Sequence, residues 1–182
     1  VLTLNVSNVN SLNETGNYSV KWEYLLFNNS WKTLSTDGEN ELILTQDHVG
    51  KEIRSVITFE DNFGLIRSLS SNITNPIQNI NDLPQGLPLI NGDTLIGNSL
   101  SYNLSNLYDE DGLGDISTMW QSSNDNIIWQ DVTSDSNLKL NDELLGHNVR
   151  LKASYTDNFG TLETIYSNLS EKIYGYSNNE II

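Results

Sequence analysis

The second half of this chain repeats the first half in order, and this repeat constrains the fold more than any other feature. Sliding the sequence against itself gives an offset of 98 residues through the early part of each half, which shortens to 96 residues further on. The aligned positions include Trp22 and Trp120, Trp31 and Trp129, Arg54 and Arg150, and the tetrapeptides Asp-Asn-Phe-Gly at 61–64 and 157–160. Matches of this kind in one register indicate a duplicated folding module.

The periodicity within each module is that of β-strands. Apolar side chains at Val149, Leu151, Ala153 and Tyr155 alternate with polar ones, which places one face of a strand in a core. Residues 53–59 repeat this pattern in the first module. Short strands separated by turns about every 8–12 residues predict an all-β chain of two tandem antiparallel β-sandwich modules, immunoglobulin-like in type.

Turn residues predict how the strands connect. The Asp-Asn-Phe-Gly tetrapeptide separates two strand-like runs in each module, which indicates a β-hairpin. A second hairpin carries both tryptophans of each module, and we expect the first of them, Trp22 or Trp120, to fill the core. Between the hairpins, residues 45–50 and 141–146 combine a capping side chain with a final glycine, which predicts one helical turn.

Proline and glycine mark the boundary between the modules. Pro84 removes a backbone donor and biases its predecessor toward an extended conformation, and Gly86 follows. The first module is expected to lack its opening strand, because the strand-like residues 88–97 precede Ser99, the residue with which Val1 aligns. The predicted division is 1–78 for the first β-sandwich repeat, 79–86 for a linker, 87–174 for the second repeat and 175–182 for a tail.

The charge balance excludes some partners. Nine Lys and Arg residues stand against 24 Asp and Glu residues, and the net charge of -15 would repel nucleic acid and anionic membrane surfaces while attracting calcium. No apolar run is long enough to cross a membrane, so insertion of this segment is not expected. The absence of cysteine excludes disulfides and thiolate metal sites. An acidic surface is equally consistent with a role in solubility alone.

Two acidic or amide-rich segments are candidates for calcium binding. In the loop Asp-Glu-Asp-Gly-Leu-Gly-Asp at 109–115, carboxylates two and six positions apart and glycines that permit a tight turn allow one loop to wrap a hard cation. The boundary at 79–82 adds further side-chain oxygens. Ordinary polar turns remain the alternative in both places. The candidate metal ligands are Asp109, Asp111, Asp115, Asn79, Asn81 and Asp82.

The first module supplies an internal comparison for the acidic loop. Its aligned positions are Ser11, Asn13 and Asn17, so three charges are missing, and calcium is expected to bind weakly or not at all there. Asp61 and Asp157 head the paired hairpin turns, where they act either as ligands or as turn-forming side chains that bond to their own backbone; we favour the turn.

No feature of the sequence predicts an enzyme. The two histidines, His48 and His147, do not align with each other, and neither a cysteine nucleophile, a phosphate-binding glycine loop nor a Gly-x-Ser-x-Gly elbow is present. A carboxylate pair of the glycosidase kind is defined by separation in space and stays open. Trp31 and Trp129 are candidate stacking platforms for a sugar, although cross-strand packing is the favoured interpretation.

Together these motifs resemble the tandem immunoglobulin-like or cadherin-like repeats of very large bacterial extracellular proteins, including adhesins of the RTX type. The first module matches more loosely, with Trp-Glu in place of Trp-Gln. The residues that carry the resemblance are Asn81 to Gly86, Asp109 to Gly114, Trp120, Gln121, Trp129, Gly146, Arg150 and Tyr155 to Thr161.

The resemblance implies a non-catalytic structural or spacer repeat of a large secreted or cell-surface bacterial protein, an adhesin, rigidified by calcium. Its partners would be neighbouring repeats of the same longer chain and a cell-surface glycan or protein. The alternatives are a glycan- or protein-binding module and an accessory domain of a polysaccharide-active enzyme.

Overall fold

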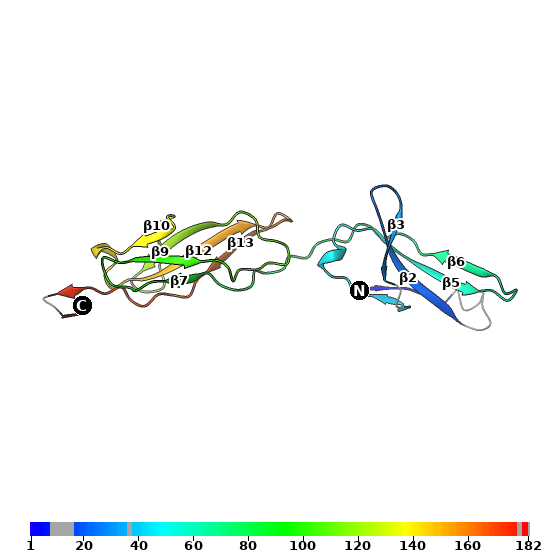
Figure 1. The fold of residues 1–182 in the computed structure, drawn as a ribbon, viewed down its shortest axis with the longest axis horizontal. Helices are drawn as coiled ribbons and strands as arrows, with labels where there is room; N and C mark the ends of the chain where they lie inside the picture. Colours follow the sequence, from blue (N-terminus) through cyan, green and yellow to red (C-terminus); the bar gives the residue numbers. More distant parts are fainter. Residues whose placement is uncertain (8–16, 36–37, 178–179, 182) are drawn as a thin grey trace. The chain divides into compact units, whose positions relative to one another are not determined.

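The computed structural model describes residues 1–7, 17–35, 38–177 and 180–181, and in this part the chain is built from antiparallel strands (Figure 1). The prediction of an all-β chain with antiparallel sheets is confirmed. The chain divides into two compact units, Val1–Ile80 (unit 1) and Asn81–Ile182 (unit 2). No helix among the described residues is long and apolar enough to span a membrane.

Unit 1 has a four-stranded sheet and a two-stranded sheet. The larger has the order β3 (Trp31–Ser35), β2 (Tyr18–Leu25), β5 (Ile53–Glu60) and β6 (Ile66–Ser70). The smaller pairs β1 (Leu2–Thr3) with β4 (Glu41–Leu42). Both hairpins predicted for the first module are therefore present, as β2–β3 and β5–β6.

Unit 2 repeats this plan, with three strands instead of two in its smaller sheet. Its four-stranded sheet has the order β10 (Gln130–Thr133), β9 (Ser117–Ser123), β12 (Asn148–Thr156) and β13 (Leu162–Tyr166). Its second sheet has three strands, β11 (Asn137–Lys139), β8 (Ser99–Asn103) and β7 (Leu89–Asn91). A short pair, β14 (Tyr176–Ser177) with β15 (Glu180–Ile181), falls in the stretch predicted as a tail.

A tryptophan lies at the centre of each core. Trp120 is fully buried between the two sheets of unit 2, in a cluster that joins residues of β8 and β11 to residues of β12. Its indole Nε1 donates to the backbone oxygen of Asp135 at 3.1 Å, so burial leaves no polar atom of the ring unpaired. Trp22 of unit 1 is also buried, and its indole Nε1 donates to the backbone oxygen of Glu39 at 3.1 Å. The prediction for both residues is confirmed.

Alternation along the long strands decides which side chains reach these cores. On β12 the residues Val149, Leu151, Ala153 and Tyr155 are buried, while the residues between them are partly exposed. Strand β5 shows the same pattern in unit 1. A period of two is what a sheet with one packed face requires, and the prediction from sequence holds on both strands.

The connections between sheets are short helical turns of the 3₁₀ type. They are η1 (Gln46–His48) and η2 (Asp142–Leu144), at the two places predicted for a helical turn. Gly50 and Gly146 follow them with φ of +75° and +78°, a left-handed conformation that favours glycine.

The start of unit 2 is fixed by backbone pairing. Gln85 donates to the backbone oxygen of Tyr108 at 2.7 Å and accepts from the Tyr108 amide at 3.0 Å. Residues 81–86, predicted as part of a linker, therefore lie against unit 2. Gly86 follows with φ of +79°, and a Cβ at this position would lie 1.9 Å from the backbone oxygen of Asn106.

We expect Gly86→Ala to destabilise unit 2 by roughly 3 kcal/mol, because the new methyl group would displace backbone as well as strain φ. Gly97→Ala is the matched control: its φ is +93° and nothing lies within 4 Å of the new Cβ, so only the strain of about 1 kcal/mol remains. Urea unfolding of the two variants measures both losses. Equal losses would show that the close approach at Gly86 contributes nothing.

Candidate metal site

The acidic loop of unit 2 folds back on itself with its carboxylates inside. Asp109 and Asp111 are 5% and 1% exposed, and burial this deep is unusual for carboxylates. The Asp111 amide donates to Asp109 Oδ1 at 2.8 Å, and the Gly112 amide donates to the Asp109 backbone oxygen at 3.0 Å. Gly112 has φ of +93° and allows this tight turn.

Residues from the start of unit 2 join this loop. The Asp82 amide donates to Asp111 Oδ2 at 2.7 Å, and Asn81 Nδ2 donates to Glu163 Oε1 at 2.8 Å. The structure thus brings four of the six predicted ligands, those in 81–82 and 109–111, into one region of unit 2. Asp115 is exposed at the surface. Asn79 belongs to unit 1, where its Oδ1 accepts from Gln46 Nε2 at 3.0 Å.

Two further residues of this region were not predicted as candidates. Tyr155 and Glu163 are direct cross-strand partners on β12 and β13, so their side chains lie on the same face of the sheet. The Tyr155 hydroxyl donates to Asp109 Oδ2 at 2.5 Å. Burial raises the pKa of Tyr155, as do this bond and the charges of Asp109, Glu163 and Asp157. Tyr155 therefore stays protonated and donates to a carboxylate inside an acidic region.

Asp157 has one bonded and one unbonded oxygen. Its Oδ1 accepts from the amides of Phe159 and Thr161, both at 2.8 Å, so it holds its hairpin turn as favoured from the sequence. Burial acts to raise the pKa of Asp157, but the bonds from the backbone of Thr161 and Phe159 outweigh it, and the pKa is lowered. Asp157 is only 6% exposed, and its Oδ2 is buried with no hydrogen-bond partner among the described residues.

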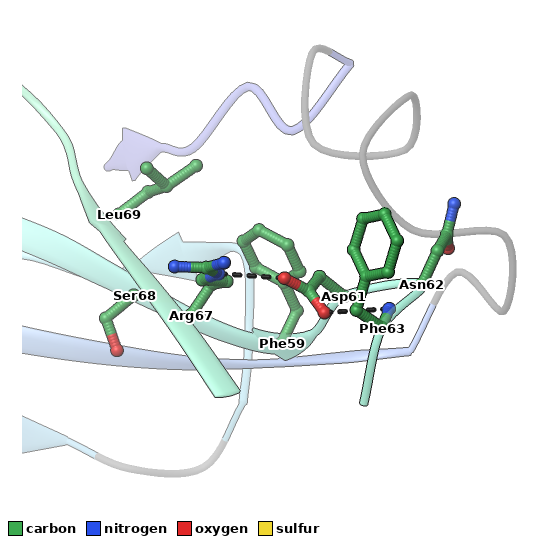
Figure 2. A pocket seen from close by; sticks show the side chains of 7 residues that line it. All are labelled: Phe59, Asp61, Asn62, Phe63, Arg67, Ser68 and Leu69. Carbon is green, nitrogen blue, oxygen red and sulfur yellow. Dashed lines mark hydrogen bonds and ion pairs between the residues drawn. The ribbon is translucent and has the colours of Figure 1, made fainter. Parts of the chain in front are cut away.

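In unit 1 the residue aligned with Asp157 is Asp61, and it forms a salt bridge with Arg67. Asp61 also bonds to its turn through Oδ1, and its Oδ2 accepts from Arg67 Nε at 2.8 Å (Figure 2). Arg67 and Asp61 line one side of a hollow of about 390 Å³. At the offset of 96 the counterpart of Arg67 is Glu163, so unit 2 places a second carboxylate where unit 1 has a guanidinium.

The acidic group of unit 2 is defined as Asp109, Asp111, Asp157 and Glu163. All four side chains are at most 8% exposed. Buried carboxylates cost free energy unless they are paired, protonated or bound to a metal. Carboxylate, amide and backbone oxygens are the ligands that calcium prefers, so the chemistry of this group fits a hard divalent cation.

The described residues do not form a finished coordination shell. No group of three or more His, Asp or Glu side chains among them is arranged to hold a metal ion. Several of these oxygens already accept bonds from amides or from Tyr155. The loop of the first module aligned with 109–115 carries Ser11 and Asn13, which lie outside the described residues.

The tryptophans predicted as sugar platforms stack on arginines. The guanidinium of Arg54 lies 3.7 Å from the ring centroid of Trp31, and that of Arg150 lies 4.1 Å from Trp129. Arg150 also lies 4.0 Å from the ring centroid of Tyr166. Each contact is worth about 0.5–1 kcal/mol when exposed and covers one face of the indole, so that face is unavailable to a sugar.

The arginines are held by different partners in the two units. Arg54 Nε and Nη2 both donate to Glu23 Oε2, at 3.1 and 2.9 Å, whereas Arg150 Nε donates to the amide oxygen of Gln121 at 2.9 Å. Burial acts to raise the pKa of Glu23, but hydrogen bonds and charge from Lys21 and Arg54 outweigh it, and the pKa is lowered from 4.5.

Comparison with known proteins gives no assignment: no protein-family model and no curated protein matches this chain. The site must therefore be interpreted from its own geometry.

We expect unit 1 to lose about 1 kcal/mol of stability in acid through Glu23, a modest amount because Lys21 is exposed. The folded pKa lies below 4.5, so this stabilisation is complete above pH 4.5 and disappears as the pH falls through the folded pKa. Glu23→Gln recreates the Gln121–Arg150 pair of unit 2 and should remove this part of the pH dependence. Thermal unfolding between pH 3 and pH 7 (about one reading per half unit) tests it; identical profiles for both proteins would contradict the assignment.

Proposed function

We propose that this chain is a pair of non-catalytic structural repeats from a large secreted or cell-surface bacterial protein, an adhesin, and that calcium rigidifies it. The repeats space a binding region elsewhere in the longer chain. The observation that carries the proposal is the acidic group of unit 2, which buries four carboxylates and leaves Asp157 Oδ2 with no hydrogen-bond partner among the described residues.

The duplication supports this interpretation. Both units keep the aspartate that holds the hairpin turn, yet only unit 1 keeps an arginine beside it. Unit 2 has Glu163 where unit 1 has Arg67, and it adds Asp109 and Asp111. These carboxylates create a need for a cation from solution, whereas unit 1 supplies a cation of its own. A divalent ion satisfies that need with oxygen ligands alone.

The position of the acidic group explains what calcium binding would achieve. Asn81 and Asp82 bond to Glu163 and Asp111, and they follow directly after the last residue of unit 1. A cation that draws these carboxylates together would hold the first residues of unit 2 against its body. The length of free chain next to the unit boundary would then shorten, which limits bending at that point. Affinities of about 0.1–1 mM suffice for calcium sites of extracellular modules.

We expect calcium to raise the melting temperature of unit 2 and to leave unit 1 unchanged. At about 100 times the dissociation constant a ligand adds about 2.7 kcal/mol, which corresponds to a rise of roughly 10–20 °C for a unit of this size. Calorimetric scans in excess calcium and in chelator measure the rise. The double variant Asp109→Asn/Asp111→Asn should lose most of it, and a variant that responds like the parent protein would contradict the site.

A charge replacement gives a sharper test. Glu163→Arg places a guanidinium beside Asp157, as Arg67 stands beside Asp61 in unit 1. We expect this variant to be at least as stable as the parent in chelator and to gain little from calcium, because the internal cation replaces the external one. Glu163→Gln is the matched control that removes the charge without supplying a cation. If Glu163→Arg still gains the full rise with calcium, the acidic group is not the binding site.

A further inference from the structure

The larger sheet of unit 2 carries an arginine between two aromatic rings. Arg150 alternates with the buried residues of β12, so it lies on the face of the sheet turned away from the core. Its guanidinium lies 4.1 Å from the ring centroid of Trp129 and 4.0 Å from that of Tyr166, and its Nε donates to Gln121 Oε1 at 2.9 Å. These contacts hold the guanidinium in place while the residue stays partly exposed to solvent.

A second cation lies on the same face. Lys152 follows Arg150 by two positions on β12, which places both side chains on one side of the strand and their Cα atoms roughly 7 Å apart. Lys152 is partly exposed and is the cross-strand partner of Tyr166. The ring of Tyr166 therefore belongs to a residue that neighbours both cations.

The partner of the arginine differs between the units. In unit 1 Arg54 donates through Nε and Nη2 to the carboxylate of Glu23, which also forms a salt bridge with Lys21. In unit 2 the same position of the repeat is Gln121, whose amide oxygen accepts from Arg150. An amide orients the guanidinium without neutralising its charge. The charge of Arg150 is therefore less compensated by this partner than the charge of Arg54.

Two neighbouring positions differ in the same sense. At the offset of 96 residues Lys152 aligns with Val56, and Tyr166 aligns with Ser70. Each pair lies directly opposite across its two strands, so the alignment holds in three dimensions. Unit 2 thus has an additional cation and an additional aromatic ring beside the arginine.

One acidic residue belongs to the same network. Asp131 is exposed and accepts from Gln121 Nε2 at 2.7 Å, whereas unit 1 has Thr33 at the aligned position. The amide of Gln121 therefore stands between this carboxylate and Arg150. Asp131 and the net charge of -15 disfavour a polyanion. A ligand with one carboxylate on an otherwise neutral molecule fits this charge distribution.

The strand pairing narrows the class of ligand further. Strand β12 is paired on one edge with β9 and on the other with β13, so the backbone around Arg150 offers no free edge to an extended peptide. Recognition on this face must come from side chains. A sugar ring can pack its C–H groups against an aromatic side chain, and Tyr166 is 38% exposed. A carboxylate on the same sugar reaches the neighbouring cations.

We propose that this face of unit 2 binds an acidic sugar, a uronic acid residue of an otherwise neutral glycan. Arg150 and Lys152 bind the carboxylate, and Tyr166 packs against the sugar ring. Because Trp129 and Gln121 already hold the guanidinium, little of its freedom is lost on binding. The proposal goes beyond a spacer role and does not depend on calcium.

The test is an amide NMR titration of the whole chain, in chelator, with the methyl glycoside of glucuronic acid. We expect a dissociation constant of about 1 mM, with shifts around Arg150, Lys152 and Tyr166 and none around Arg54. The methyl glycoside of glucose lacks the carboxylate and acetate lacks the ring, so each should bind at least about tenfold more weakly. Acetate that binds as tightly as the glucuronide would overturn the proposal, because the sugar ring would then contribute nothing.

Two variants take their replacements from unit 1. Gln121→Glu recreates the Glu23–Arg54 pair, so an internal carboxylate competes for Arg150 and glucuronide binding should weaken at least about tenfold with no loss of melting temperature. Tyr166→Ser changes an exposed position and should weaken glucuronide binding while leaving acetate binding unchanged. Parental affinity for the glucuronide in either variant would overturn the proposal. Tighter binding of a tetraglutamate peptide would overturn it in favour of an acidic protein segment.

Discussion

Each unit depends on one tryptophan packed between two sheets. Trp22 and Trp120 carry the largest buried side chains of their cores, and each bonds through its indole nitrogen to a backbone oxygen of the chain that leads to β4 or β11. This interaction ties the larger sheet to the connection between sheets. Both copies keep this anchor, and they differ at other places.

The clearest difference is electrostatic. Unit 1 neutralises the aspartate of its β5–β6 turn with Arg67, whereas unit 2 has Glu163 at the position aligned with Arg67. Both arrangements rest on the same backbone, because the turn is held in each case by amide bonds to one aspartate oxygen. The second oxygen can then bind a cation, either an arginine of the chain or an ion from solution. Unit 1 uses Arg67, and we propose that unit 2 uses calcium.

The sequence by itself determined what depends on local spacing. Alternation on β5 and β12 predicted strands and their buried faces, and the repeated tetrapeptide predicted the hairpin turns, because side-chain direction in a strand changes with every residue. The acidic loop at 109–115 was recognised as a candidate site because its carboxylates lie close together along the chain.

Only the tertiary structure decided which oxygens come together. Asn81 and Glu163 are 82 positions apart and meet through a side-chain hydrogen bond, which no local pattern encodes. Asn79 and Asp115 looked equivalent to the other candidates, yet one belongs to unit 1 and the other is exposed. Comparing the copies residue by residue would have identified Glu163, since it occupies the place of Arg67. That signal becomes interpretable only when the neighbouring carboxylates are known to be buried.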